Sequence, residues 1–501
     1  MKANGSDVVE IDAESNILDN SSKRPRMCHS MFDGNQEAEG LGWNYAGRGF
    51  LIMGGVFLST ALLSLAQKDA GCDDLEPGEE CNGRTHGIRP SSLLTLIGSV
   101  SMFVATAIMP IAGAIVDHTD YRRAVLISSD LILLVINFAQ ASLSEDTWFF
   151  VAMLQLVGPL FYLCGNVVLF AYIPEITDDS VLQTKYNTNF EACRAICMIF
   201  SLVSAVILAR VFPGIGESGT LKYEVGSARV AQVWVSTLGL VAFLVSFWKM
   251  KPRVALSDVP QGKSLLTTSF YKIGNTLTTV WRHHPTLFWF SVSIILIESV
   301  GSSFLTIVIT YMVDFLGFNS SQVAINFLII LLGIIAGNKT LPWLTRKLGL
   351  LQTLKLSTLG VISLTLFTAI VVRGPDQGQI MYPLSFVMGY MKGSSNPNLR
   401  LIFLQIMPRG QESEMLGFYF FCSMGFSWGP PLLFTAINEA GFRTNYGLAT
   451  MSVLPIIGFG TLHMMGQIES AVEHTRRTGK ETISTVSEEK DRGHGHGIGA
   501  K

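Results

Sequence analysis

The feature that most limits the fold of this chain is a series of twelve runs that contain almost no charge. Within them only Asp130, Glu298 and Lys392 are charged, although 15% of all residues are. The runs cover residues 49–67, 92–116, 124–143, 148–174, 195–209, 230–248, 285–313, 315–338, 356–372, 377–399, 415–438 and 444–468. A bilayer core of about 30 Å needs roughly 17 to 25 apolar residues per helix. Eleven runs reach that length, and the run at 195–209 reaches it when it is extended toward its N-terminus.

These runs predict an all-α polytopic membrane protein, because lipid requires each backbone segment to satisfy its own hydrogen bonds. The pattern excludes a soluble enzyme and a β-barrel, whose strands alternate in polarity. A net charge of −2 also argues against nucleic acid as a partner, since such binding needs a basic surface. We find no nucleophile with a base and no set of metal ligands at a shared depth. The sequence therefore predicts neither enzyme activity, nor a metal, nor a cofactor.

The longest hydrophilic stretch between runs separates six of them from the other six. We expect a disordered cytosolic tail at 1–40, a six-helix half at 41–248, a cytosolic loop at 249–284, a second six-helix half at 285–468 and a disordered cytosolic tail at 469–501. A six-plus-six duplication is typical of secondary transporters, whose substrate lies near the midplane between the halves. The expected partners are the bilayer, a small solute and, if transport is coupled, protons, with the chain working as a monomer.

Loop charges predict the orientation. Thirteen Lys and Arg residues fall in the loops on one side and eight on the other, which places both termini in the cytosol. The acidic first loop then lies outside or in a lumen. Cys72 and Cys81 share this loop, so they could form a disulfide in an oxidising compartment; the paired and the free state both remain open.

The turn after the second run reads GAIVDHTDYRR from Gly113 to Arg123. Gly113 permits a close approach of helices, and Asp117 could accept hydrogen bonds at the N-terminus of a helix in the other half. Arg122 and Arg123 could meet carboxylates such as Glu175. Such contacts would close the cytosolic side; the alternative is an ordinary positively charged turn.

This turn resembles the loop signature of the major facilitator superfamily, although Asp120 stands where that signature has glycine. The pairs GW at 42–43 and HP at 284–285, together with AYIPEI at 171–176, make the chain similar to the autophagy-related vacuolar amino-acid effluxers of that superfamily. The resemblance covers residues 42–467. It implies a 12-helix bundle of two pseudo-twofold halves that exports neutral amino acids such as leucine from a vacuole or lysosome.

Two embedded charges lie near the midplane. Glu298 is roughly 20 Å from the start of the seventh span, and Lys392 roughly 18 Å from the outer end of the tenth, at 1.5 Å per helical residue. In the superfamily that the chain resembles, the first, fourth, seventh and tenth helices line the cavity. The two charges could hold the ends of a zwitterion, or Glu298 could carry a coupling proton while Lys392 holds an anion. The structural alternative is a buried ion pair between them.

The tenth span also contains a polar stretch, in which Gly393 and Pro397 are expected to weaken the helix and expose carbonyl groups. A broken helix at membrane depth is tolerated where it lines a cavity. We therefore predict substrate contacts from this stretch and from the matching part of the fourth span. The candidates are Ser394, Ser395, Asn396, Asn166 and Gln155.

The other embedded charges allow several readings. Asp130 could pair with Arg194 or carry a proton, and Glu191 with Arg194 has the i, i+3 spacing of a helical ion pair. Arg48 and Arg400 are expected to reach the cytosolic interface with their charged ends.

The sequence thus favours a secondary transporter that moves a small polar solute by alternating access. The alternatives are a transport-inactive sensor or receptor with signalling tails, and a carrier for another small organic solute. The membrane could be vacuolar, lysosomal or plasma membrane.

Overall fold

The computed structural model describes residues 31–72, 81–177, 180–212, 216–217, 219–253, 265–408 and 412–465. Within these ranges the chain is helical, and its β pairing is one isolated bridge between Thr85 and Ile88. The elements are α1 (Gln36–Asp69), α2 (Pro90–His118), α3 (Arg122–Gln140), α4 (Trp148–Ile176), α5 (Ser180–Val211), α6 (Leu221–Lys249), α7 (Leu265–His283), α8 (Pro285–Thr310), η1 (Tyr311–Phe315), α9 (Ser320–Leu348), α10 (Leu350–Val371), η2 (Pro375–Ile380), α11 (Met381–Ile406), α12 (Glu412–Met424), α13 (Gly429–Glu439), α14 (Thr444–Thr450) and α15 (Val453–Met464).

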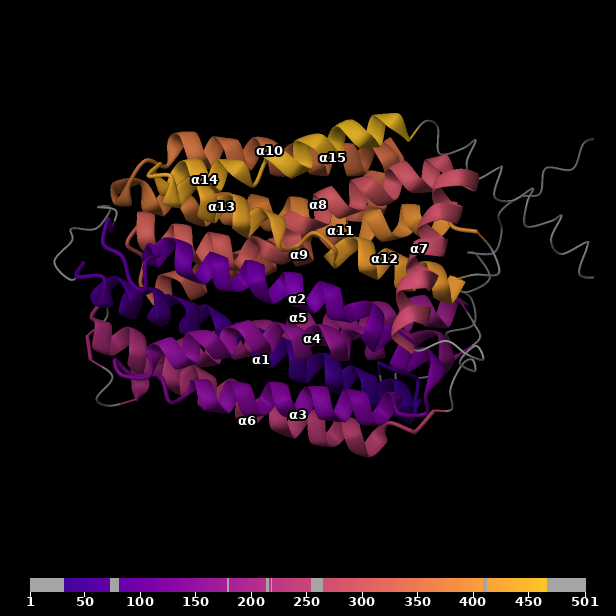
Figure 1. The fold of residues 1–501 in the computed structure, drawn as a ribbon, viewed down its shortest axis with the longest axis horizontal. Helices are drawn as coiled ribbons and strands as arrows, with labels where there is room; N and C mark the ends of the chain where they lie inside the picture. The colour runs from indigo at the N-terminus through magenta and orange to yellow at the C-terminus, as the bar shows by residue number, and fades with distance from the viewer. Residues whose placement is uncertain are drawn as a thin grey trace, which may run out of the picture.

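Eleven helical segments in the described ranges are long and apolar enough to cross a membrane. Three of them combine two elements: α8 with η1, α12 with α13, and α14 with α15. Figure 1 shows these segments lying side by side along the long axis of the molecule, with α11 among them. α11 has 26 residues, but its polar stretch makes it less apolar than the others. The predicted all-helical membrane bundle is confirmed.

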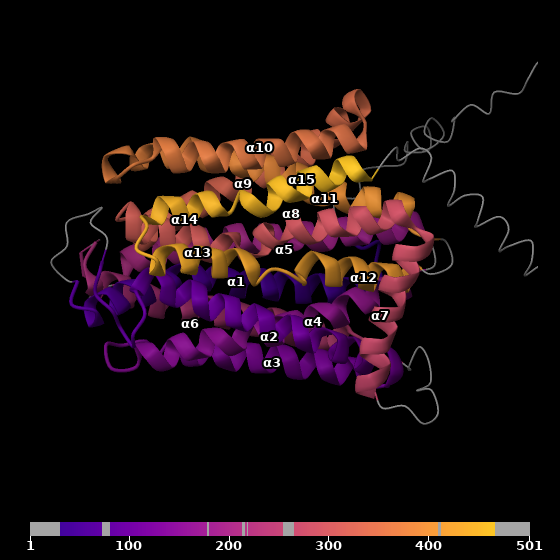
Figure 2. The ribbon, with the colours of Figure 1, turned by 45° about the horizontal axis from the view of Figure 1, so that its top comes forward.

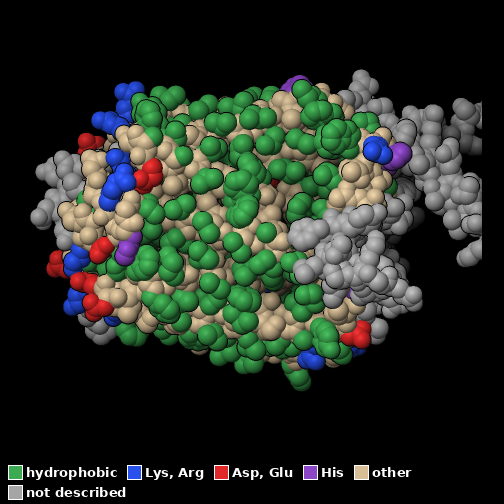
Figure 3. Space-filling view, viewed as in Figure 1, with side chains coloured by type: hydrophobic (Ala, Val, Ile, Leu, Met, Phe, Trp, Pro, Cys, Tyr) green, Lys and Arg blue, Asp and Glu red, His purple; other side chains and the backbone are tan. Residues whose placement is uncertain are grey.

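The surface has the polarity that a membrane requires. In Figure 3 hydrophobic side chains cover the middle of the visible face, and charged side chains gather toward the ends of the bundle. Large apolar side chains in the middle of the helices are exposed, among them Phe103, Val135 and Phe367. In lipid these side chains need no further cover.

The two ends of the bundle differ. We call the end where α1 begins and α15 finishes the tail end, and the opposite end, where α1 meets the first loop, the disulfide end. A disulfide joins Cys72 to Cys81 in that loop, with the Cα atoms 5.8 Å apart. At the tail end α7 runs across the ends of the other helices, as Figure 2 shows. α7 lies in the region expected to be a loop, between the half formed by α1 to α6 and the half formed by α8 to α15.

The two halves share their largest hydrophobic core at the disulfide end. At the disulfide end a single cluster takes buried residues from both halves, including Phe57 of α1 and Phe327 of α9. At the tail end each half has a core of its own. A smaller cluster links α2 and α4 to Phe420 of α12, whose ring centre lies 4.6 Å from that of Phe170. The halves are therefore held together most extensively at the disulfide end.

Candidate functional site

The N-terminal half buries an ion pair midway along α1. Arg48 Nη2 lies 2.5 Å from Asp130 Oδ1 on α3, and their side chains are 1% and 0% exposed. Asn44 donates to the other oxygen of Asp130 at 2.6 Å and accepts from Arg48 Nε at 2.9 Å. Arg48 Nη1 donates to the carbonyl of Tyr162 and to Asn166 Oδ1, both on α4, at 2.7 and 3.1 Å. We call these five residues the Arg48 cluster.

The cluster has room because residue 165 is a glycine, which has no side chain. A Cβ at Gly165 would lie 1.8 Å from Arg48 Nη2. Arg48 thus does not reach the membrane interface, which the sequence had led us to expect. Asp130 pairs with Arg48 and not with Arg194, which instead forms the predicted pair with Glu191.

In the C-terminal half two charges meet at a glycine. A Cβ at Gly301 of α8 would lie 1.9 Å from Lys392 Nζ on α11 and 3.4 Å from Glu298 Oε2 on α8. The charged groups of Lys392 and Glu298 therefore both lie next to Gly301.

A small cavity lies next to this pair, enclosed by helices of the C-terminal half. Lys392, Ser395 and Thr358 contribute polar groups to a wall that is otherwise mostly apolar. The cavity volume is about 20 Å³, which is enough for one or two water molecules. Lys392 is therefore one of the few polar groups in the wall of a mostly apolar cavity inside this half.

Three polar residues form a stripe along α11. Lys392, Asn396 and Arg400 follow each other at intervals of four residues, a spacing that puts them on one side of a helix. Asn396 is exposed, and the guanidinium carbon of Arg400 lies 5.8 Å from the centre of the Phe170 ring on α4. Arg400 thus contacts the other half of the protein.

The other polar side chains of α11 face neighbouring helices. Ser394 is 1% exposed and its hydroxyl lies 3.5 Å from the carbonyl of Gly337 on α9. Asn398 donates to the carbonyl of Leu350 on α10 at 2.9 Å. α11 is continuous through its glycine and proline residues, so the expected break in this helix is not formed.

The two candidates on α4 are separated. Asn166 belongs to the Arg48 cluster, whereas Gln155 lies eleven residues earlier. At 1.5 Å per residue this is roughly 16 Å along the axis. The structure therefore brings Asn166, and not Gln155, to the depth of the embedded charges.

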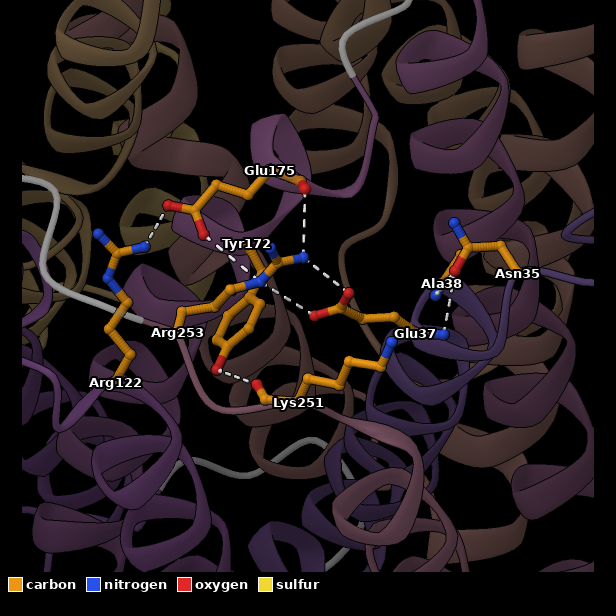
Figure 4. A network of polar contacts seen from close by, with 8 residues as sticks. All are labelled: Asn35, Glu37, Ala38, Arg122, Tyr172, Glu175, Lys251 and Arg253. Carbon is orange, nitrogen blue, oxygen red and sulfur yellow. Dashed lines mark hydrogen bonds and ion pairs between the residues drawn. The ribbon is translucent and has the colours of Figure 1, made fainter.

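A second group of charges lies at the tail end, and Figure 4 shows it. Arg253, which follows α6, places Nη2 2.7 Å from Glu37 Oε2 and Nε 3.7 Å from Glu175 Oε2. Arg122 pairs with the other oxygen of Glu175, as the sequence suggested. The phenol of Tyr172 donates to the carbonyl of Lys251 beside them at 3.2 Å. This tail-end cluster joins α1, α3, α4 and the end of α6, all of which belong to the N-terminal half.

The rest of the predicted gating turn has other contacts. Arg123 donates to the carbonyl of Phe247 on α6 at 2.7 Å. A Cβ at Gly113 would meet Val167 at 4.0 Å, an ordinary contact, so crowding does not require glycine there. The side chain of Asp117 lies outside the described residues. A gating role for this turn stays a prediction.

The Arg48 cluster was missed because the first helix begins earlier than its apolar run. Asn35 caps α1 by accepting from the backbone N–H groups of Glu37 and Ala38. Arg48 thus lies twelve residues into the helix, or roughly 18 Å from its start. An asparagine followed by acidic residues is a helix-start signal, and it was present in the sequence.

The chain is similar to a known protein family and to several solved structures. Residues 38–475 match the model of a family described as "Vacuole effluxer Atg22 like". No curated protein matched the chain.

Among solved structures, the inward-open xylose transporter XylE from E. coli has a TM-score of 0.59 at 14% identity, over 87% of this chain and 97% of that one. The nucleoside transporter NupG gives 0.56 at 12% identity, over 86% and 100%. A peptide transporter, POT, in complex with alafosfalin, gives 0.58 at 12% identity, over 88% and 96%. At these identities the likeness is one of fold.

Proposed function

Because the chain belongs to the Atg22-like vacuole effluxer family, a family of transporters, we propose that it moves a small zwitterionic solute, of the size of a neutral amino acid, by alternating access. The solute would leave a vacuole or lysosome toward the cytosol. The tail end would then face the cytosol, in agreement with the loop charges, and the disulfide end the lumen.

The observation that carries this proposal is the meeting of Glu298 and Lys392 at Gly301. A carboxylate and an ammonium at membrane depth are costly and are retained mainly where they act on a solute or an ion. Placed side by side at Gly301, they offer one partner to each end of a zwitterion. Asn396 and Arg400 extend the polar surface along α11 toward the N-terminal half.

The N-terminal half contains the other embedded candidate for proton coupling, Asp130. Both carboxylate oxygens of Asp130 are occupied by Arg48 and Asn44 inside an enclosed cluster. A proton could replace these contacts only if the cluster came apart. If transport is coupled to protons, we therefore favour Glu298 over Asp130 as the carrier.

The test is transport by the purified full chain in liposomes, with labelled leucine as the probe. Glu298→Gln and Lys392→Met should each lower uptake about tenfold or more, since each removes a charge that would contact the solute. Lys347→Met is a matched control, because Lys347 is exposed and stacks on Trp343 at 4.4 Å. It should leave uptake unchanged.

Two other outcomes separate the alternatives. If another small organic solute moves in place of leucine and both variants stop it, the site stands and the amino-acid assignment is wrong. If no solute from a metabolite screen moves, the transport proposal fails and a sensor or receptor becomes the better explanation.

A further inference from the structure

Hydrogen bonds between the two halves concentrate at the disulfide end, and three carboxylates are among the acceptors. Glu224 of α6, Asp314 of η1 and Glu439 of α13 each accept a hydrogen bond from the opposite half. At the tail end the described contacts between halves are mainly aromatic, such as Phe170 with Phe420. The polar contacts therefore lie where the two halves share their core.

Glu224 binds the start of a helix in the other half. Its two carboxylate oxygens lie 3.1 and 3.3 Å from the backbone nitrogen of Ser320, the first residue of α9. The first N–H groups of a helix have no partner within the helix and carry its positive dipole end. Glu224 is 4% exposed, so little solvent weakens this interaction. The hydroxyls of Ser227 and Ser320 lie 3.1 Å apart beside it.

Glu439 does the same at the start of α2. Its Oε1 accepts from the backbone nitrogen of Arg89, the N-cap of α2, at 2.9 Å. Its Oε2 lies 3.5 Å from Arg84. The hydroxyls of Thr95 on α2 and Thr435 on α13 lie 2.7 Å apart one turn deeper. This contact is more open than the first, since the Glu439 side chain is 27% exposed.

The two contacts bind corresponding helices of the two halves. α2 is the second membrane helix of its half, and α9 is the second of the other. Each starts at the disulfide end, and a carboxylate from the opposite half binds each start. Between them, Asp314 accepts from Gln67 of α1 at 3.0 Å and from Thr444 of α14 at 3.1 Å.

We propose that Glu224 and Glu439 are the gating residues that hold the disulfide end closed, each by binding the start of a helix in the opposite half. The proposal rests on the alternating-access transport proposed above. For the disulfide end to open, the hydrogen bonds from the starts of α2 and α9 to these carboxylates must break. Water must then accept hydrogen bonds from the freed N–H groups. The two residues act on the solute indirectly, by setting how often the site faces this end.

A cross-link tests the closed state without a transported solute. In the full chain, with the cysteines in the spans replaced by alanine, Ser227→Cys and Ser320→Cys place two thiols where the hydroxyls are 3.1 Å apart. A disulfide should form readily there, because contacting side chains are within its geometric reach. Adding Glu224→Gln, which keeps the shape and removes the charge, should slow cross-linking about fivefold or more, the size of a typical coupling between states.

A matched control and a rescue separate gating from damage to the fold. Glu217→Gln removes an exposed carboxylate at the same end and should leave the rate unchanged. Glu224→Asp keeps the charge and should restore part of the rate. Glu439→Gln should act in the same direction as Glu224→Gln, although it lies at a different helix start.

A second measurement reads the motion directly. Spin labels at Lys222→Cys and Asp376→Cys, both exposed on opposite halves at this end, should report a larger population of long distances in Glu224→Gln and Glu439→Gln. If both variants cross-link at the parental rate and keep the parental distances, the gating proposal is wrong. If the unsubstituted chain moves no solute although both variants shift the distances, the transport proposal fails instead, so the two failures are distinguishable.

Discussion

Arg48 on α1 and Asp130 on α3 form an ion pair that is shut off from solvent, with Nη2 and Oδ1 2.5 Å apart. Each charge is satisfied only while the other is present. Asp130→Ala should therefore lower the free energy of unfolding by about 3–5 kcal/mol, because it leaves Arg48 buried without its counterion. Thermal or denaturant unfolding of the purified chain measures this.

The double replacement gives the sharper result. In Arg48→Met with Asp130→Leu, no charge remains buried, so most of the lost stability should return, as it does when apolar residues replace a whole buried ion pair. If the double variant is as unstable as Asp130→Ala, the cluster is not a stability device of this kind. Transport by a stable double variant would also show that Asp130 carries no coupling proton.

Two glycines near the same helices give a matched pair. Gly165→Ala brings a Cβ to 1.8 Å from Arg48 Nη2, whereas Gly113→Ala brings one to 4.0 Å from Val167. Overpacking of this kind costs about 1–3 kcal/mol, so we expect a lower unfolding temperature for the first variant. The second should change stability by no more than about 0.5 kcal/mol. Equal effects would mean that Arg48 relocates freely.

The contact between α9 and α11 depends on glycine backbones. A Cβ at Gly337 would lie 2.2 Å from the carbonyl oxygen of Tyr390, and one at Gly393 would lie 2.3 Å from that of Ile334. Backbone atoms cannot move aside as a flexible side chain can, so Gly337→Ala should separate the two helices. We expect a loss of at least about 2 kcal/mol in unfolding experiments. Gly417→Ala, on α12 with open space around it, should be neutral or slightly stabilising.

Substitution of Gly301 tests the proposed site while both charged residues, Glu298 and Lys392, stay in place. A Cβ there would lie 1.9 Å from Lys392 Nζ, and a lysine end group can swing away at small cost. Gly301→Ala should thus leave the unfolding temperature nearly unchanged and raise the KM for transport severalfold, because the amine no longer lies beside Glu298. Gly55→Ala, on α1 with nothing within 4 Å, is the control. An unchanged KM would argue that the position of Lys392 is unimportant for binding.

The α9–α11 contact also shows where sequence reasoning reached its limit. The number of spans, their division into two halves and the polar stretch of α11 could all be predicted from charge and hydropathy. Gly393 was interpreted as a residue that weakens its helix, and in the structure it lets α9 approach. A glycine that breaks a helix and one that admits a neighbour look the same in sequence, since only the partner backbone distinguishes them.

Partners within the membrane were equally hard to predict. The depth of Glu298 and Lys392 could be counted along their spans, but depth does not say which residues face each other. For Asp130 the sequence left open a pair with Arg194 and a role as a proton carrier, whereas the chain supplies Arg48 from α1 as its partner. The polar contacts of Glu224 and Glu439 involve backbone N–H groups, which every residue carries and which no sequence pattern marks.

The tail-end cluster, finally, yields a prediction that separates a gate from a scaffold. Arg253 contacts Glu37 and Glu175, and all three belong to the N-terminal half. Arg253→Gln leaves the two carboxylates facing each other, and with side chains that are 10–30% exposed the expected loss is about 1 kcal/mol. Lys185→Gln removes a more exposed pair with Asp33 and should cost less than that. Because the cluster spans no boundary between halves, the Ser227–Ser320 cross-linking rate should stay at its parental value in Arg253→Gln; a changed rate would instead support the gating role that the sequence suggested for Glu175.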